Sequence, residues 1–140
     1  MKKHVANAVW NGSIKEGSGK ISTKSEVLHD TKYSFGTRFG NDKGTNPDEL
    51  IAASHAGCFA MALSLILGKN GFTPDSVQVK AEVTMDPDKL ELTGSHLTLN
   101  AKIPGINQDK FLEIANAAKD GCPISKALSI PITLDATLES

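Results

Sequence analysis

Two cysteines are the side chains of this sequence best suited to covalent chemistry. Cys58 lies within a long apolar stretch, and Cys122 stands between Gly121 and Pro123. A lone cysteine in an apolar stretch is most often a small buried hydrophobic residue. A cysteine just before a helix-starting proline meets free backbone N–H groups and the positive end of the helix dipole, which stabilise a thiolate. Cys122 is therefore better suited than a core cysteine to act as a resolving or leaving sulfur.

His55 is the titratable side chain nearest to Cys58. It lies three residues earlier, so both side chains share one side of a helix. This spacing is compatible with a histidine that partners the thiolate and equally with a packed core histidine. A Cys58–His55 hydrolase is disfavoured, because both residues lie on one helix and no third group that would orient the histidine is evident.

A metal site is an alternative use of the same side chains. Its ligands would be Cys58, Cys122, His55 and one of His4, His29 or His96. Zinc ligands usually come in close pairs such as Cys-x-x-Cys, and this sequence has no such pair. We therefore expect no bound metal and no resident cofactor.

Three charged residues on the N-terminal side of Cys58 could influence its thiol: Arg38, Asp48 and Glu49. At about 100° per residue, Asp48 lies about 80° from Cys58 around a helix axis, and Glu49 lies on the opposite side. A straight helix would place Asp48, rather than Glu49, on the side of the thiol, and a kink near the helix start would change this. From its position alone, Arg38 is an ordinary solvated arginine of a loop.

The helix that carries Cys58 has clear start and stop signals. Asn46 is a suitable N-cap, Pro47 fits the first helical position, and the two acidic residues that follow favour the positive end of the dipole. The helix should run to about Lys69, with Gly71 in the left-handed conformation that ends it. Its length would be about 30 Å.

The rest of the chain predicts strands and shorter helices. Upstream, we expect a hairpin of His4–Trp10 and Gly19–Val27 and a less regular strand at Tyr33–Phe39. Downstream, we expect a strand at Val77–Met85 and a returning strand over Leu90–Ile103 with a bulge near Gly94–Ser95. We then expect a helix through Phe111–Gly121, a short helix from Pro123 to about Leu128, and a strand at Ile130–Leu138. This order indicates an α+β fold with antiparallel sheets and a long buried central helix.

Length and charge narrow the class of protein. The chain has 140 residues, a common size for one domain, so we expect a single domain over residues 1–140. Its 15 basic and 16 acidic side chains are mixed along the sequence, which gives no electrostatic basis for a nucleic-acid partner.

The apolar stretch Leu50–Leu67 approaches the length that spans a bilayer. Polar residues at Ser54, His55 and Ser64 interrupt it, so we expect a helix buried in protein and no membrane partner. We also expect no signal peptide and a cytoplasmic location. In a reducing compartment a structural disulfide is disfavoured, whereas a transient catalytic disulfide is permitted.

Several motifs resemble the OsmC/Ohr family of osmotically inducible and organic-hydroperoxide-resistance proteins. They are Thr37-Arg38-Phe39, Gly44-Thr45-Asn46-Pro47-Asp48-Glu49-Leu50, Ala52-Ala53-Ser54-His55-Ala56-Gly57-Cys58-Phe59 and Gly121-Cys122-Pro123-Ile124-Ser125. The resemblance covers essentially the whole chain. It favours the OsmC-like branch, because the arginine comes just before the long helix.

This resemblance implies an intertwined homodimer, with each active site at the subunit interface, that reduces organic hydroperoxides. Cys58 would be the peroxidatic thiol, Cys122 the resolving thiol that forms a disulfide with it, and Arg38 the cation that stabilises the thiolate. The acidic residue that orients the arginine is usually glutamate in the family, and here Asp48 takes that position. We favour Asp48, with Glu49 as the alternative.

The resemblance also implies an external dithiol reductant, of the dihydrolipoyl type, as a protein or a lipoyl group. The apolar neighbours of Cys58, such as Phe59 and Met61, would suit the tail of an organic hydroperoxide. The alternative is a non-catalytic dimeric stress or binding protein of the same fold, since a fold alone does not establish a function.

Overall fold

The computed structural model describes residues 1–139, and its chain falls into two units, Met1–Leu50 and Ile51–Ser140. We call them the first and the second unit. Helices and strands occur in both, so the predicted α+β class is confirmed. The single domain expected over residues 1–140 stays a prediction, because two such units can belong to one domain.

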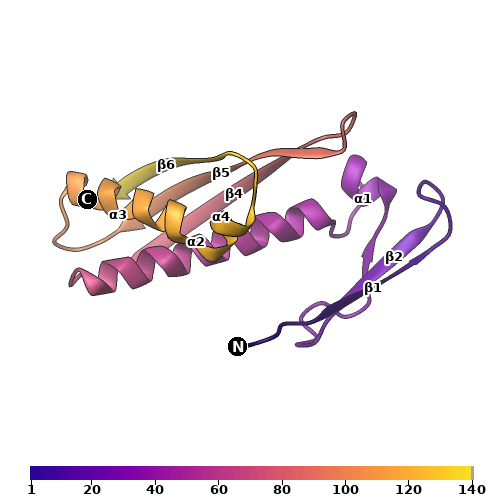
Figure 1. Cartoon of the computed structure of the whole chain (residues 1–140), viewed down its shortest axis with the longest axis horizontal. Coiled ribbons are helices and arrows are strands. Elements are labelled where there is room, and N and C mark those ends of the chain that lie inside the picture. Colours follow the sequence, from indigo (N-terminus) through magenta and orange to yellow (C-terminus); the bar gives the residue numbers. More distant parts are fainter. Residues whose placement is uncertain (140) are drawn as a thin grey trace. The chain divides into compact units, whose positions relative to one another are not determined.

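The first unit contains a three-stranded antiparallel sheet in the order β1-β2-β3 (Figure 1). Its strands are β1 at Ala6–Asn11, β2 at Ser18–Thr23 and β3 at Thr31–Tyr33. The predicted hairpin is therefore confirmed, with somewhat shorter strands. The rings of Trp10 and Tyr33 lie 5.5 Å apart over Gly19, where a Cβ atom would collide with both rings.

The third strand predicted at Tyr33–Phe39 is wrong for most of its length. After β3, the chain forms the short helix α1 at Phe35–Phe39. A capping box begins this helix: the Ser34 hydroxyl accepts from the Thr37 N–H at 3.2 Å, and the Thr37 hydroxyl oxygen accepts from the Ser34 N–H at 2.8 Å. Arg38 consequently lies on a helix and not on the expected loop.

The long helix α2 spans Pro47–Lys69, as predicted. At its start, the Asn46 side-chain oxygen accepts the Glu49 N–H at 2.8 Å, which satisfies a backbone donor of the first turn. At its end, Gly71 adopts a φ of 83°, the left-handed conformation expected there. Within the second unit, Phe59, Leu63 and Leu67 recur every four residues and are fully buried, so one face of α2 enters the core.

The second unit contains a three-stranded sheet in the order β4-β5-β6. Its strands are β4 at Ser76–Asp86, β5 at Glu91–Lys102 and β6 at Ile132–Glu139. Strands β4 and β5 are antiparallel, as predicted, but β6 runs parallel to β5. The expectation of purely antiparallel sheets is therefore corrected, because two helices carry the chain back along the sheet before β6 begins.

These helices are α3 at Gln108–Gly121 and α4 at Pro123–Ala127 (Figure 1). Both were predicted: α3 begins three residues before the predicted start at Phe111 and ends at Gly121 as expected, and α4 ends one residue before the expected Leu128. Cys122 is the residue between them, and its N–H still bonds to the Ala118 carbonyl at 3.0 Å. Cys122 has an extended backbone conformation and is at once the C-cap of α3 and the N-cap of α4.

The predicted bulge in the returning strand lies one residue from the expected place. Thr84 pairs with Gly94, whereas Met85 pairs with Leu92, so Thr93 is the extra residue. The bulge separates the two apolar phases of the sequence: Leu97, Leu99 and Ala101 beyond it are buried in the core, whereas Leu90 before it is 72% exposed.

One apolar core fills the second unit and unites α2, β5 and α3. Its buried residues are Phe59, Leu63, Leu67, Leu97, Leu99, Ala101, Ile103, Phe111, Ile114, Ala115 and Ala118. The core holds three elements that are far apart in sequence, and it thereby sets the position of α4, which follows α3 directly.

Candidate active site

Two thiols meet in the second unit. The Sγ atoms of Cys58 on α2 and Cys122 at the start of α4 lie 2.8 Å apart, and both cysteines are free. A disulfide bond is about 2.05 Å long, so the sulfur atoms need only a small shift to bond. The residues are 64 positions apart in sequence, and the shared core described above brings them together.

The two thiols differ in exposure. Cys122 is fully buried, whereas Cys58 is partly exposed. A molecule arriving from solvent therefore reaches the sulfur of Cys58 first. The two chemically identical groups therefore differ in their access to solvent.

The pKa of the Cys58 thiol is raised from its ordinary value. Burial is the largest cause, followed by its hydrogen bond with Cys122 and the charge of the Cys122 thiolate. The backbone N–H of Ile124 opposes this shift but does not outweigh it. Within the second unit, Cys58 is consequently held in its thiol form.

The pKa of Cys122 is lowered. Burial alone would raise it, but hydrogen bonds from the Cys58 thiol, from the backbone N–H and hydroxyl of Ser125 and from the Ile124 N–H outweigh burial. In the neutral pair the Cys122 thiol donates to Cys58. Once one proton leaves, the charge settles on Cys122 and Cys58 becomes the donor. The thiolate-favouring surroundings expected at the start of the short helix are therefore present.

His55 is a packed core histidine rather than a partner of a thiolate. It is fully buried, with Nδ1 at 2.7 Å from the Ser95 hydroxyl and Nε2 at 2.8 Å from the Ser125 hydroxyl. Burial lowers its pKa, so the ring is neutral near pH 7. Sequence reasoning missed both serines. Ser125 belongs to the motif around Cys122, which was the only signal available for it.

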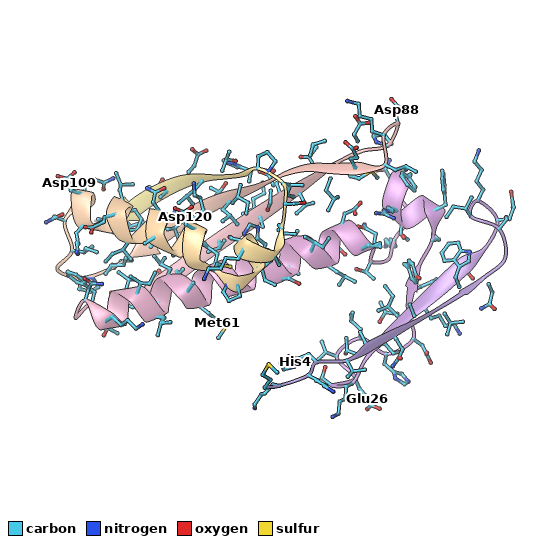
Figure 2. All side chains as sticks on the ribbon, in the orientation of Figure 1. His4, Glu26, Met61, Asp88, Asp109 and Asp120 are labelled. Carbon is cyan, nitrogen blue, oxygen red and sulfur yellow. The ribbon has the colours of Figure 1, made fainter. Side chains whose placement is uncertain are left out.

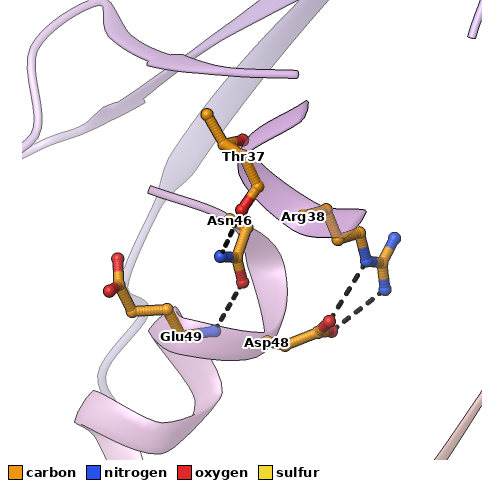
Figure 3. A network of polar contacts seen from close by, with 5 residues as sticks. All are labelled: Thr37, Arg38, Asn46, Asp48 and Glu49. Atoms are coloured by element: carbon orange, nitrogen blue, oxygen red, sulfur yellow. Dashed lines mark hydrogen bonds and ion pairs between the residues drawn. The ribbon is translucent and has the colours of Figure 1, made fainter. Parts of the chain in front are cut away.

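In the first unit, Arg38 and Asp48 form a bidentate ion pair (Figure 3). Arg38 donates from Nη2 to Oδ1 of Asp48 at 3.0 Å and from Nε to Oδ2 at 3.3 Å. Two parallel hydrogen bonds fix the plane of the guanidinium. The shorter aspartate side chain therefore reaches the arginine, as favoured from the sequence.

Glu49 points to a different partner. Its carboxylate accepts the Thr45 hydroxyl at 2.9 Å. Between the two acidic residues, Asn46 caps α2 and donates to the Thr37 carbonyl at 2.9 Å, which ties α1 to the start of α2 (Figure 3). The anchoring of α1 places Arg38 opposite Asp48.

Four of the five predicted site residues thus form two pairs, Arg38 with Asp48 in the first unit and Cys58 with Cys122 in the second, while Glu49 bonds to Thr45. Their catalytic roles stay predictions. Within residues 1–139, no group of three or more His, Cys, Asp or Glu side chains is arranged to hold a metal ion.

A close pair of thiols, one partly exposed and one buried, on an α+β scaffold defines a small dithiol protein. Comparison with known proteins identifies its relatives. The model of the family described as OsmC-like protein matches residues 40–136. The chain belongs to this OsmC-like protein family.

Two curated relatives show the range of similarity. Peroxiredoxin OsmC of Escherichia coli is 47% identical over 135 residues, which cover 95% of this chain and 94% of that protein. Organic hydroperoxide resistance protein OhrB of Bacillus subtilis is 34% identical over 113 residues, covering 79% of this chain and 81% of the relative. The names of these relatives indicate a role of the peroxidase type, and the resemblance to the OsmC/Ohr family is confirmed.

Solved structures share the fold. The crystal structure of OhrB from Bacillus subtilis superposes with a TM-score of 0.64 at 24% identity, covering 96% of this chain and 98% of that one. The OsmC-like protein from Mycoplasma pneumoniae gives a TM-score of 0.77 at 16% identity, with 99% of both chains covered. The predicted fold class is therefore confirmed.

Proposed function

We propose that this protein is a cysteine-based peroxidase that reduces organic hydroperoxides to alcohols. The observation that carries the proposal is the 2.8 Å contact between a partly exposed and a buried thiol. The names of the relatives, a peroxiredoxin and organic hydroperoxide resistance proteins, support the same chemistry.

Cys58 is the peroxidatic residue in this proposal, because its sulfur is the one open to solvent. Its thiolate attacks the terminal oxygen of the hydroperoxide, the O–O bond breaks, and the alkoxide takes a proton and departs as an alcohol. Cys58 is left as a sulfenic acid. The sulfur of Cys122 then attacks Cys58, which releases water and forms the Cys58–Cys122 disulfide before further oxidation occurs.

Arg38 is the cation that activates Cys58 in this proposal. Burial and Cys122 both raise the pKa of the Cys58 thiol, so an additional positive charge is needed to favour its thiolate. A guanidinium provides a charge that does not titrate near neutral pH. The bidentate pair with Asp48 holds it in one orientation, while Glu49 bonds to Thr45 and is not required for this role.

The proposed active form is a homodimer. Met61 and Leu65 lie four residues apart on α2, with exposed fractions of 76% and 61%. Figure 2 shows Met61 projecting away from the ribbon of α2. Helix α2 is also long and apolar enough to cross a membrane, a test that core helices of globular proteins meet as well. A second copy of the chain would cover this apolar strip, and apolar side chains beside Cys58 would receive the tail of the substrate.

The catalytic cycle requires a reductant from outside the chain. A dithiol of the dihydrolipoyl type would reduce the Cys58–Cys122 disulfide in two exchange steps and become a disulfide itself. No resident cofactor takes part in this cycle. A reducing cytoplasmic setting, as proposed from the sequence, is compatible with a disulfide that forms only in turnover.

The proposal is tested by peroxide consumption at equal concentrations of cumene hydroperoxide and hydrogen peroxide, with dihydrolipoamide as reductant. We expect faster consumption of cumene hydroperoxide and complete loss of turnover in Cys58→Ser. Cys122→Ser should react once and then accumulate a Cys58 oxidised beyond the sulfenic acid. Turnover retained in Cys58→Ser would refute the proposal, and a preference for hydrogen peroxide would refute the apolar substrate site.

A further inference from the structure

Two polar contacts bridge α2 and α4 side by side. Cys58 and His55 are three residues apart on α2, and Cys122 and Ser125 are three residues apart at the start of α4. The two thiols lie 2.8 Å apart, and His55 Nε2 lies 2.8 Å from the Ser125 hydroxyl oxygen. Because side chains three apart share a helix face, the histidine–serine contact lies next to the thiol pair.

The hydrogen bonds of His55 restrict which atoms carry protons. The ring is neutral, so one nitrogen donates and the other accepts. With the proton on Nε2, His55 donates to Ser125 and accepts at Nδ1 from the Ser95 hydroxyl, 2.7 Å away. The hydroxyl hydrogen of Ser125 is then free to point to a different acceptor. All three buried side chains are satisfied in this arrangement.

Cys122 is the residue that this free hydroxyl hydrogen of Ser125 can serve, because His55 and Cys58 share one face of α2 and contact Ser125 and Cys122 at 2.8 Å each. The Ser125 hydroxyl and backbone N–H both favour the thiolate of Cys122. Ser125 and His55 are 8% and 0% exposed, so water competes little for these hydrogen bonds. Two hydrogen bonds therefore join Ser95, His55 and Ser125, and Ser125 lies three residues after Cys122 at the start of α4.

We propose that His55 is a positioning residue that aims the Ser125 hydroxyl at Cys122, which makes Cys122 the departing thiolate when the Cys58–Cys122 disulfide is reduced. This inference deepens the proposed function and rests on it for the disulfide. A reductant thiolate attacks the accessible Cys58 sulfur and forms a mixed disulfide with it. The Cys58–Cys122 bond breaks, and its electron pair goes to Cys122, where the Ser125 hydrogen bond receives it. The second thiol of the reductant then releases Cys58 as a thiolate.

The rate of this exchange depends on the leaving sulfur, because a thiol of lower pKa departs faster. Removal of a hydrogen bond to the leaving thiolate should slow reduction about three- to tenfold. The histidine affects the rate only through Ser125. A residue that merely supported folding would not change the thiolate preference of Cys122 in a folded variant.

The experiment begins with disulfide made by diamide rather than by a hydroperoxide, so its result does not depend on peroxidase turnover. The rate of reduction by dithiothreitol is then measured for the wild type, Ser125→Ala, Ser125→Thr and the exposed control Ser129→Ala. We expect the slower rate in Ser125→Ala only, since threonine keeps a hydroxyl. Thermal unfolding of each variant confirms that it is folded.

A matched pair at His55 tests the role of the histidine. Gln places an amide near Nε2 and keeps a donor toward Ser125, whereas Asn places its amide near Nδ1 and loses that donor. We expect His55→Gln to retain the rate and His55→Asn to lose it as Ser125→Ala does.

The titration of Cys122 provides a second readout. In a Cys58→Ser background, the ultraviolet absorbance of the Cys122 thiolate is followed against pH. Ser125→Ala should raise the pKa by about one unit, and Ser129→Ala should not. Equal reduction rates in the wild type and Ser125→Ala, or slower reduction with an unchanged Cys122 titration, would overturn the inference. Failure of hydroperoxide to form the disulfide would instead refute the proposed function alone.

Discussion

At the scale of single residues, the thiol pair carries its negative charge on the sulfur of Cys122, the buried cysteine, once one proton has left. The surroundings of Cys122 favour its thiolate, while burial and the neighbouring sulfur raise the pKa of Cys58. A buried thiolate is suited to attack a sulfenic acid next to it and to depart from a disulfide. The exposed thiol, which meets the peroxide, needs a further cation. The proposed role of Arg38 follows from this need.

Exchanging the acidic residues for amides tests how Arg38 is oriented. Asp48→Asn removes the charge from the bidentate pair, and Glu49→Gln makes the same chemical change one residue later. We expect kcat/KM for cumene hydroperoxide to fall about tenfold in Asp48→Asn, because a hydrogen bond between charged groups is lost. Glu49→Gln should stay within about twofold of the wild type. The reverse order of the two effects would assign the orienting role to Glu49.

The buried His55 also predicts how stability depends on pH. Its folded-state pKa lies below the ordinary value of 6.5, so the unfolded chain binds a proton more readily than the folded one. The free energy of unfolding should therefore fall as the pH drops below about 6.5, by up to about 1.4 kcal/mol per pH unit. His55→Gln should flatten this dependence in urea unfolding measured from pH 7 to pH 5. The exposed His29→Gln is the control, and an equal slope in both variants would contradict the assignment.

The sequence was sufficient to select the two cysteines and Arg38 as candidate site residues and to favour Asp48 over Glu49 as the partner of Arg38, because each of them lies in a local motif. It did not identify the serines around His55. Ser95 and Ser125 are 40 and 70 positions away from His55, and contacts over such separations depend on packing that no local pattern encodes. The choice between a packed histidine and a thiolate partner required the same contacts.

At the scale of elements, the sequence predicted those whose ends carry strong signals. Helix α2 begins and ends where the Asn46-Pro47 and Gly71 signals place it. Helix α1 was missed because it is one turn long and owes its start to a serine–threonine capping box. The parallel pairing of β6 was also missed, since alternation of apolar residues shows which side chains are buried but not the direction of the strand.

Loss of the α2 cap should have a measurable cost. Asn46→Ala removes the acceptor for the Glu49 N–H and the donor to the Thr37 carbonyl. We expect the free energy of unfolding to fall by about 1 kcal/mol or more. Chemical denaturation of this variant and of the exposed control Asn7→Ala provides the comparison. No difference between them would contradict the role of Asn46 as a cap.

At the scale of the whole molecule, the apolar strip of α2 is the feature that a single chain leaves unexplained. One face of the helix forms the core of the second unit, while Met61 and Leu65 remain largely exposed. The sequence predicted a long helix buried in protein, and within one chain only part of its surface is buried. The proposed second copy would account for the remainder.

Charges introduced on this strip test the dimer. Leu65→Glu would place a carboxylate in the proposed interface, where burial of an unpaired charge is costly. Sedimentation velocity at micromolar concentration should show a dimer for the wild type and a monomer for Leu65→Glu. Val27→Glu, at a residue 85% exposed, should remain dimeric. A monomeric wild type would contradict the proposed assembly.

The central claim is that an organic hydroperoxide joins Cys58 to Cys122 within one chain. For the direct measurement, reduced protein labelled with light nitrogen is mixed with reduced protein labelled with heavy nitrogen, and one equivalent of cumene hydroperoxide is added. Free thiols are then blocked, and the tryptic peptides are mapped by mass spectrometry. The account predicts a disulfide between peptides 44–69 and 120–126, always of the same isotope, that dihydrolipoamide reverses. Two blocked cysteines after consumption of the peroxide, or linked peptides of mixed isotopes, would contradict it.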